Sequence, residues 1–165
     1  KEVIYSYNTT YAINLLAQAM VKSKFLQKGD VVLLGMRDHH ANVLPWMNLA
    51  EMMGFEVQFV ATDENYQIDW NDFDQKYTEK VKVAMGQVSN VTGAIYDLKK
   101  IRSKIRPETF FLIDGSQSVP NMIVDMEDLG ADAVVFTAHK IMASTGLGVL
   151  ALKNHWIKEW TPLIL

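Results

Sequence analysis

The amino-acid sequence predicts an α/β fold built on a mostly parallel sheet of roughly seven strands. Short apolar runs alternate with helical segments along the chain, and this order requires helical crossovers between parallel strands. The run Val31–Met36 (VVLLGM) is apolar on both faces, as in a strand that a parallel sheet buries on both sides. The length of 165 residues fits about one domain with a core of its own.

The first half of the chain contains three of the expected strands and two of the expected helices. Val3–Tyr7 is the first strand, and Asn8-Thr9-Thr10 follows as the turn and N-cap of an amphipathic helix at Thr10–Leu26. Such a cap places free N–H groups and the positive end of the helix dipole at the C-terminal edge of the sheet, where an anion can bind. The remaining elements here are the strand Val31–Met36, the helix Asn42–Met53, which Gly54 ends, and the strand Glu56–Val60.

The second half opens with an acidic segment, residues 61–80, whose charges indicate a solvated face. The helices expected after Ala61 are Trp70–Tyr77, Asp97–Ile105 and Val124–Leu129. The strands expected there are Val81–Val88, Phe110–Ile113, Val134–Thr137 and Leu147–Leu152. The chain has no internal repeat and no low-complexity segment.

Composition excludes several classes of function. The net charge of -3 offers no basic surface for nucleic acid. The chain contains no cysteine, which excludes disulfides, thiolate metal sites and a cysteine nucleophile from this chain. No run approaches the roughly 18 apolar residues that span a bilayer, so we expect a cytoplasmic protein that does not bind a membrane. The strand-like start KEVIYSYN and the apolar end TPLIL suggest a piece of a larger protein.

Polar residues follow five of the expected strands. In an open α/β sheet ligands bind outside the C-terminal ends of the strands, so these residues should share one site. They are Thr9-Thr10, Asp38-His39, Ser89-Asn90, Asp114 with Gln117, and Thr137 with His139-Lys140. These residues supply the parts that are needed to hold pyridoxal 5'-phosphate. The parts are a phosphate-binding site, an imidazole, an Asp that keeps the pyridine nitrogen protonated, and a strand-end Lys that forms a Schiff base. Desolvation at a strand end would favour the neutral, nucleophilic form of Lys140.

Four ordered segments carry a family resemblance. DGSQSVPNMIVDMEDLGADAVVFTAHKIMASTGLGVLALK resembles the cofactor-binding core of the class V aminotransferase group of fold type I enzymes, and most closely that of the cysteine desulfurases and selenocysteine lyases. NTTYAINLLA, DHHANVLPW and QVSNVTG resemble three further segments of those enzymes in the same order. The resemblance implies a three-layer sandwich whose seven-stranded sheet is mixed, with the last strand antiparallel. It also implies that residues 1–165 are a partial large domain that lacks an N-terminal segment and a C-terminal small domain.

The resemblance assigns roles to individual residues. Lys140 would form the Schiff base with the cofactor and then move the proton at the substrate Cα. Asp114 would pair with the pyridinium nitrogen and Gln117 would hydrogen-bond the phenolate oxygen. His39 would stack on the ring and take part in proton transfer, while Asn90 would lie beside the substrate carboxylate. Four residues would hold the phosphate, namely Thr9, Thr10, Thr137 and His139.

The sequence departs from the family pattern at several positions. Gln87 stands where these enzymes usually have His, Ala138 replaces a Gly, and Met142-Ala143-Ser144 replaces a Tyr-Gly-Pro type run. The mobile cysteine that receives sulfur and the arginine that grips the substrate carboxylate lie in the family's C-terminal part and have no counterpart here. We therefore expect this chain to be inactive as a desulfurase by itself. The resemblance implies an amino-acid substrate, a homodimer in the full-length protein and a sulfur-acceptor protein as partner.

Other functions remain as alternatives. A class V aminotransferase with another amino-acid substrate would share every motif above. A metal-dependent phosphoesterase could use Asp38-His39-His40, but the early part of the chain lacks the D-x-D carboxylates that such a site needs. A NAD-binding domain would need G-x-G-x-x-G after the first strand, which is missing. A catalytically silent domain is compatible with the family resemblance.

Overall fold

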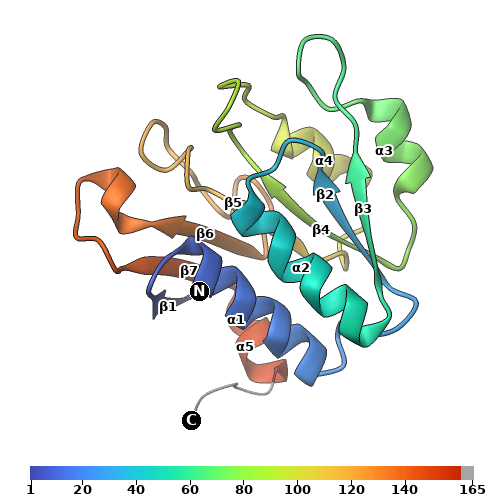
Figure 1. Cartoon of the computed structure of the whole chain (residues 1–165), viewed down its shortest axis with the longest axis horizontal. Coiled ribbons are helices and arrows are strands. Elements are labelled where there is room, and N and C mark those ends of the chain that lie inside the picture. The colour runs from blue at the N-terminus through green and yellow to red at the C-terminus, as the bar shows by residue number, and fades with distance from the viewer. Residues whose placement is uncertain (161–165) are drawn as a thin grey trace.

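The computed structural model describes residues 1–160, and these form a seven-stranded sheet in the order β1-β7-β6-β5-β4-β2-β3 (Figure 1). Four neighbouring pairs are parallel, and β7 runs antiparallel to both β1 and β6. The mixed, mostly parallel sheet and its antiparallel last strand are confirmed. The strands are β1 (Glu2–Ser6), β2 (Val31–Gly35), β3 (Glu56–Val60), β4 (Val81–Gly86), β5 (Phe111–Asp114), β6 (Ala133–Thr137) and β7 (Gly148–Leu152).

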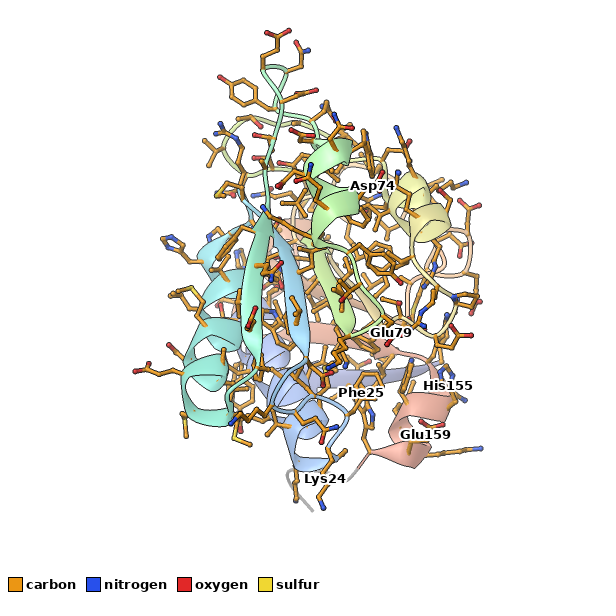
Figure 2. The ribbon with its side chains drawn as sticks, turned by 90° about the vertical axis from the view of Figure 1, so that its right-hand side faces the viewer. Lys24, Phe25, Asp74, Glu79, His155 and Glu159 are labelled. Atoms are coloured by element: carbon orange, nitrogen blue, oxygen red, sulfur yellow. The ribbon has the colours of Figure 1, made fainter. Side chains whose placement is uncertain are left out.

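Helices cover both faces of the sheet. The α-helices are α1 (Thr9–Lys22), α2 (His40–Met53), α3 (Trp70–Lys76), α4 (Leu98–Lys104) and α5 (Asn154–Glu159), and a 3-10 turn, η1 (Ala138–Ile141), follows β6. Figure 2 looks onto the β3 edge and shows α2 on one side of the sheet and α3 on the other. This is the three-layer arrangement that the family resemblance implies. Within residues 1–160 no helix is long and apolar enough to cross a membrane.

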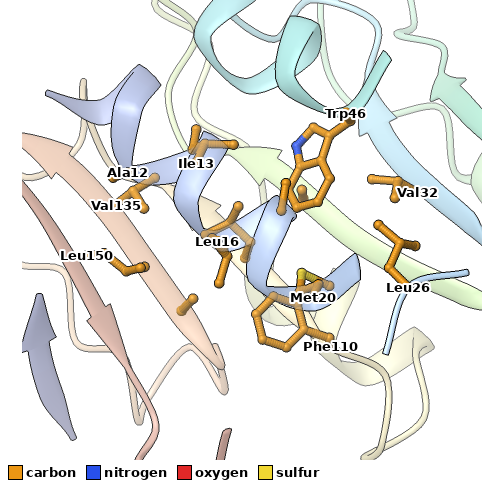
Figure 3. Close-up of a cluster of buried hydrophobic side chains, with 14 of the residues drawn as sticks. Ala12, Ile13, Leu16, Met20, Leu26, Val32, Trp46, Phe110, Val135 and Leu150 are labelled. Atoms are coloured by element: carbon orange, nitrogen blue, oxygen red, sulfur yellow. The ribbon is translucent and has the colours of Figure 1, made fainter. Parts of the chain in front are cut away.

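Two hydrophobic clusters fill the spaces between the layers. Val32 and Leu34 of β2 belong to the cluster under α1 and α2, whereas Leu33 belongs to the cluster under α3 and α4. This alternation follows from the two-residue period of a strand and explains why β2 is apolar throughout. Figure 3 shows the first cluster, in which Leu16 and Trp46 pack against the sheet. Both faces of the sheet are therefore packed against helices.

Most expected elements end within a few residues of the observed bounds, and two differ in kind. The helix expected at Val124–Leu129 is a set of turns, because the Asp125 side chain accepts the N–H groups of the next turn and Gly130 adopts a positive φ of 64°. Helix α5 was not expected, and it is fixed by Trp156, which packs against aromatic rings from outside the helix.

Helix α1 ends four residues before the expected Leu26. Lys24 adopts a positive φ of 59°, and the N–H groups of Phe25 and Leu26 both return to the carbonyl of Met20. The chain thereby leaves the helix and buries Leu26 in the core beneath it.

The topology brings the ends of β1, β2, β4, β5 and β6 to one edge of the sheet. Ser6 and Thr137 both pair with Gly148, and Gly86 pairs with Asp114. β1 thus runs in the same direction as β6, although β7 separates the two strands. The polar residues after these strands consequently meet at one edge, as the sequence predicted.

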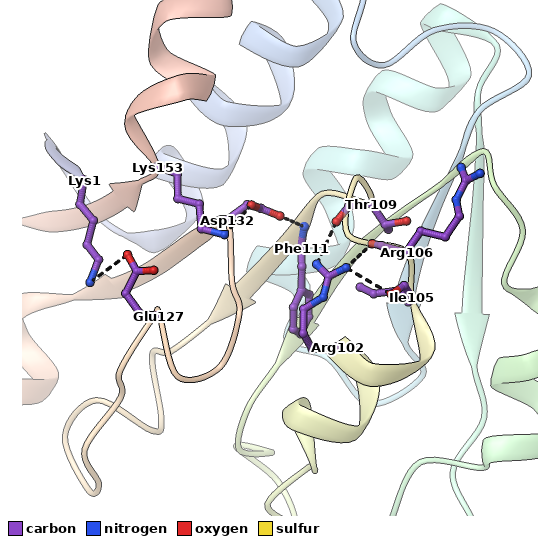
Figure 4. Close-up of polar contacts among 9 residues, drawn as sticks. All are labelled: Lys1, Arg102, Ile105, Arg106, Thr109, Phe111, Glu127, Asp132 and Lys153. Atoms are coloured by element: carbon purple, nitrogen blue, oxygen red, sulfur yellow. Dashed lines mark hydrogen bonds and ion pairs between the residues drawn. The ribbon is translucent and has the colours of Figure 1, made fainter.

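The opposite edge is tied together by polar contacts, one of them buried and most of the others partly buried (Figure 4). The Asp132 carboxylate accepts hydrogen bonds from the Phe111 N–H and from Lys153 Nζ, both at 3.0 Å. Arg102 donates to main-chain carbonyls of the segment between α4 and β5. These contacts anchor the strands at the end away from the pocket described next.

Candidate active site

A pocket of about 250 Å³ opens at the C-terminal edge of the sheet. Residues from the ends of β2, β4, β5 and β6 line it together with the N-terminus of α1. All nine residues that the sequence predicts for the site lie in its wall: Thr9, Thr10, His39, Asn90, Asp114, Gln117, Thr137, His139 and Lys140. Their co-location follows from strand direction, and their chemical roles remain predictions.

Lys140 lies in η1, directly after β6. The turn is fixed because the Ala138 N–H donates to the Leu147 carbonyl and Met142 ends the turn with a positive φ of 63°. The lysine is half-buried, and no carboxylate of residues 1–160 lies within ion-pair distance of its Nζ. An amine without a partner in a pocket is available to a ligand.

Thr137 and His139 flank the lysine and are linked to each other. The Thr137 hydroxyl donates to the Leu147 carbonyl at 3.4 Å, and its oxygen lies 3.0 Å from His139 Nδ1. A hydroxyl has one proton, so Nδ1 of His139 must be the donor in the second bond. This bond orients the ring and places Nδ1–H away from any ligand.

Asp114 ends β5 and is buried at the floor of the pocket. Its Oδ1 accepts the Ser116 N–H at 2.9 Å, which leaves Oδ2 without a donor among residues 1–160. The Ser116 hydroxyl in turn lies 2.9 Å from the Thr9 hydroxyl, and both residues are buried. The loop after β5 is thereby joined to the start of α1.

The N-terminus of α1 faces the pocket. Asn8 caps the helix, because its Oδ1 accepts the Tyr11 N–H at 2.8 Å. The helix therefore starts at Thr9, one residue before the expected start. The N–H groups of Thr9 and Thr10 have no helical acceptor, and they carry the positive end of the helix dipole. These free N–H groups lie where the sequence predicts an anion seat, and anion binding there stays a prediction.

His39 caps helix α2 in addition to lining the pocket. Its Nδ1 accepts the Ala41 N–H at 3.0 Å. A ring nitrogen that accepts cannot carry a proton, so the neutral ring is protonated on Nε2. The helix N-terminus thereby sets the tautomer of His39.

Asp38 organises the floor between β2 and β4. Its carboxylate accepts hydrogen bonds from the Gly35 N–H at 3.0 Å, the Gly86 N–H at 3.1 Å and Asn42 Nδ2 at 3.1 Å. A Cβ at Gly35 or Gly86 would lie 2.9 or 3.1 Å from Oδ1, so glycine permits the approach. Burial raises the pKa of Asp38 to about 7, the charge of Asp114 adds to the increase, and the three hydrogen bonds oppose it.

The geometry around Asp38, His39 and His40 gives little support to a metal-dependent phosphoesterase. Both oxygens of Asp38 accept from N–H donors, and residues 1–160 contain no group of three or more His, Asp or Glu residues that could hold a metal ion.

Asn90 and Gln117 sit on loops with their own internal bonds. Ser89 Oγ accepts the N–H groups of Val91 and Thr92, which curls the loop that carries Asn90. The Gln117 carbonyl accepts Nδ2 of Asn121 at 2.8 Å, one turn further along the chain. Both loops are therefore shaped before any ligand binds.

Sequence reasoning missed several pocket residues, above all Arg37. Its Nε donates to Thr62 Oγ1 at 3.0 Å, and its guanidinium lies 4.6 Å from the centre of the Tyr66 ring. The sequence signal that could have identified Arg37 is a cation beside Asp38 at a strand end. The residues that contact Arg37, Thr62 and Tyr66, come from a different segment of the chain. Gln87, the departure before Val88, does not line the pocket, and its buried Oε1 has no hydrogen-bond partner among residues 1–160.

Comparison with known proteins adds a family assignment. The family described as aminotransferase class-V matches residues 1–165. A probable cysteine desulfurase from Halalkalibacterium halodurans is 34% identical over 165 residues, which are 99% of this chain and 40% of that protein. The apo structure of a cysteine desulfurase from Thermococcus onnurineus has a TM-score of 0.90 at 29% identity and matches 99% of this chain and 41% of its own. A cysteine desulfurase from Escherichia coli gives 0.90 at 28% identity with the same coverage. The chain thus spans about 40% of the length of these relatives.

Proposed function

The chain belongs to the aminotransferase class-V family, and on this premise we propose that residues 1–165 form the pyridoxal-5'-phosphate-binding large domain of a longer enzyme that acts on an amino acid. The observation that carries the proposal is the meeting of Lys140, Asp114 and the N-terminus of α1 in one pocket. The remaining parts of such an enzyme, an N-terminal segment and a C-terminal small domain, would lie outside these residues.

The residues present fit the cofactor. The unpaired primary amine of Lys140 matches the aldehyde of the cofactor, and the buried Asp114 carboxylate, with one oxygen left without a donor, matches its pyridinium nitrogen. The two free N–H groups at the start of α1 match its phosphate. The pocket volume of about 250 Å³ lies near the lower end of small-molecule sites, about 300 Å³. These groups of the chain are in place before ligand binding.

The cofactor, when bound, supplies an electron sink for the substrate Cα. Asp114 would hold a proton on the ring nitrogen, with Ser116 N–H orienting the carboxylate. Lys140 would hold the cofactor covalently and would then carry the proton to and from the substrate Cα. Gln117 would donate to the phenolate oxygen, and Asn90 would lie beside the substrate carboxylate.

The phosphate would be bound at the other end of the pocket. Thr9 and Thr10 would supply main-chain N–H groups, and Thr137 and His139 would complete the seat. His39 would stack on the cofactor ring, with its proton on Nε2.

We propose cysteine or selenocysteine as the substrate, with removal of sulfur or selenium. The support is the cysteine desulfurase names of the relatives that this chain resembles over 98–99% of its length. The sulfur-accepting thiol must come from outside these residues, since the chain contains no cysteine. We propose further that the complete enzyme is a homodimer that passes sulfur to an acceptor protein.

Cofactor titration tests the proposal. Adding pyridoxal 5'-phosphate should give an absorbance band near the visible edge, and borohydride should fix the label on the peptide that contains Lys140. Lys140→Ala should lose the label, while Lys158→Ala, which removes an exposed lysine of α5, should keep it. Labelling confined to surface lysines, or unchanged in Lys140→Ala, would overturn the proposal.

A second measurement separates desulfuration from transamination. The full-length protein supplied with cysteine should release alanine and transfer sulfur to a thiol. Conversion of amino acids to keto acids without sulfur release would instead identify an aminotransferase with another substrate.

A further inference from the structure

Two buried hydroxyl groups in the pocket wall share a single hydrogen bond. Thr9 Oγ1 and Ser116 Oγ lie 2.9 Å apart, and the two residues are only 5% and 8% exposed. Within residues 1–160 neither hydroxyl has another hydrogen-bond partner. Each hydroxyl carries one proton, and the bond between them uses only one of the two. The second proton is therefore left for an acceptor that comes from outside the described residues.

The surroundings of the two hydroxyls decide which of them keeps this second proton when an anion is bound. Thr9 is the first residue of α1, and the free N–H groups there attract negative charge. An anion at the start of α1 would accept the Thr9 O–H, and the Ser116 O–H must then donate to Thr9 Oγ1. Hydrogen bonds in such a chain polarise one another, which strengthens the Thr9 hydroxyl as a donor.

The other two threonines of the proposed phosphate seat are in different situations. The Thr137 hydroxyl donates its proton to the Leu147 carbonyl at 3.4 Å, and its oxygen lies 3.0 Å from His139 Nδ1. Thr10 is exposed, so water competes for its hydroxyl. Of these three threonines, Thr9 alone has a buried hydroxyl whose proton remains available to a ligand.

We propose that Ser116 is a positioning residue for the phosphate of the cofactor and that it acts through Thr9, by donating to Thr9 Oγ1 and thereby turning the Thr9 O–H toward the anion. This inference rests on the proposed function. The main-chain N–H of Ser116 donates to Asp114 Oδ1 at 2.9 Å, so the same residue also orients the carboxylate proposed for the ring nitrogen. Ser116→Ala removes only the hydroxyl contact, because alanine keeps the main-chain N–H.

A double-mutant cycle tests the inference on the 165-residue chain. Dissociation constants for pyridoxal 5'-phosphate are measured by absorbance titration of the parent chain, Ser116→Ala, Thr9→Val and the double variant. Ser116→Ala should weaken binding about fivefold, the size of one hydrogen bond. It should add no further loss in the Thr9→Val background, because Ser116 acts through the Thr9 hydroxyl. Thr9→Ser, which keeps that hydroxyl, should bind as the parent chain does.

Two further measurements separate this role from a structural one. Pyridoxal, which lacks the phosphate, should bind Ser116→Ala and the parent chain equally. The phosphorus NMR signal of bound pyridoxal 5'-phosphate should move in Ser116→Ala. Ser118→Ala is the matched control, because it removes a buried hydroxyl of the same loop that donates to the Gly115 carbonyl and does not line the pocket. This control should leave both affinities and the phosphorus signal unchanged.

The contrary outcomes are distinct. A further loss from Ser116→Ala in the Thr9→Val background would show that Ser116 contacts the cofactor itself, and an equal loss for pyridoxal would show a structural role. Either result overturns the inference, as does unchanged binding of pyridoxal 5'-phosphate by Ser116→Ala, while the proposed function stands. If the parent chain binds neither compound, the proposed function itself fails, and the inference fails with it.

Discussion

Asp38 makes the stability of this fold depend on pH in an unusual direction. A carboxyl group whose folded-state pKa lies above its unfolded value binds more protons in the folded state between the two values. The pKa of Asp38 rises from 3.8 to about 7, chiefly through burial. Its contribution to stability is therefore complete below about pH 4 and is lost as the pH rises toward 7. Most paired surface carboxylates act in the opposite direction.

The size of the effect follows from the shift. A difference of about three pK units corresponds to about 4 kcal/mol, at about 1.4 kcal/mol for each pH unit. We compare the parent chain with Asp38→Asn, which keeps the shape and cannot ionise. The free energy of unfolding of the parent, relative to the variant, should fall by about 2 kcal/mol between pH 5 and pH 6.5. Urea denaturation followed by tryptophan fluorescence measures this difference.

Asp125→Asn provides a contrast of sign. The N–H groups of Asp128 and Glu127 lower the pKa of Asp125, so the stability it contributes is present above its unfolded pKa and is lost as the pH falls. The parent-minus-variant difference should therefore decline toward low pH for Asp125 and toward neutral pH for Asp38. A flat difference for Asp38 between pH 5 and pH 6.5 would refute the reasoning.

Two further predictions concern the start of α1. Gly148→Ala should destabilise the fold by about 1–3 kcal/mol, since its Cβ would lie 2.5 Å from the Asn8 main chain. Thermal unfolding should show a lower Tm than for Gly29→Ala, where no atom lies within 4 Å of the added Cβ and the cost comes from a positive φ of 87° alone; equal losses would contradict the prediction. Thr9→Val should lower the free energy of unfolding by about 1 kcal/mol, because it leaves the buried Ser116 hydroxyl unpaired. Thr10→Val, at an exposed neighbouring position, should lower it less, and urea denaturation measures both. A larger loss for Thr10→Val would contradict the importance of the Thr9 contact.

The fold was largely predictable because its signals are local. Glu56–Val60 has the expected bounds, since a β-prone run follows a helix that Gly54 ends with a positive φ. The prediction of a helix around Asp125 was wrong because the apolar spacing there fits a helix and a set of turns equally well. Side-chain capping by Asp125 decides between the two. Helix α5 was missed because Trp156 is ordered by Phe25 and Phe110, which are distant in sequence. One prediction thus failed on a local side-chain cap, and the other failed on contacts between residues that are distant in sequence.

The site was predictable to the extent that strand ends define it. Polar residues after parallel strands share an edge whatever the details, which is why all nine predicted residues line one pocket. Arg37 and Asp38 depend on side-chain contacts with segments far along the chain, namely Tyr66 and Gly86. The bond from His39 Nδ1 to Ala41 N–H also sets a tautomer that no residue pattern shows.

The antiparallel strand β7 links the two halves of the proposed cofactor site. It lies between β1 and β6, and Gly148 at its start pairs with Ser6 on one side and Thr137 on the other. α1, with its free N–H groups, begins three residues after Ser6, and Lys140 lies three residues after Thr137. One strand therefore sets the separation between the anion seat and the lysine. Because the Asn8 main chain leaves no room for a side chain at Gly148, the same glycine fixes how closely α1 approaches the sheet. A change there should weaken binding of the phosphate and covalent labelling of Lys140 together, whereas a change at Asp114 should weaken them through the cofactor ring alone.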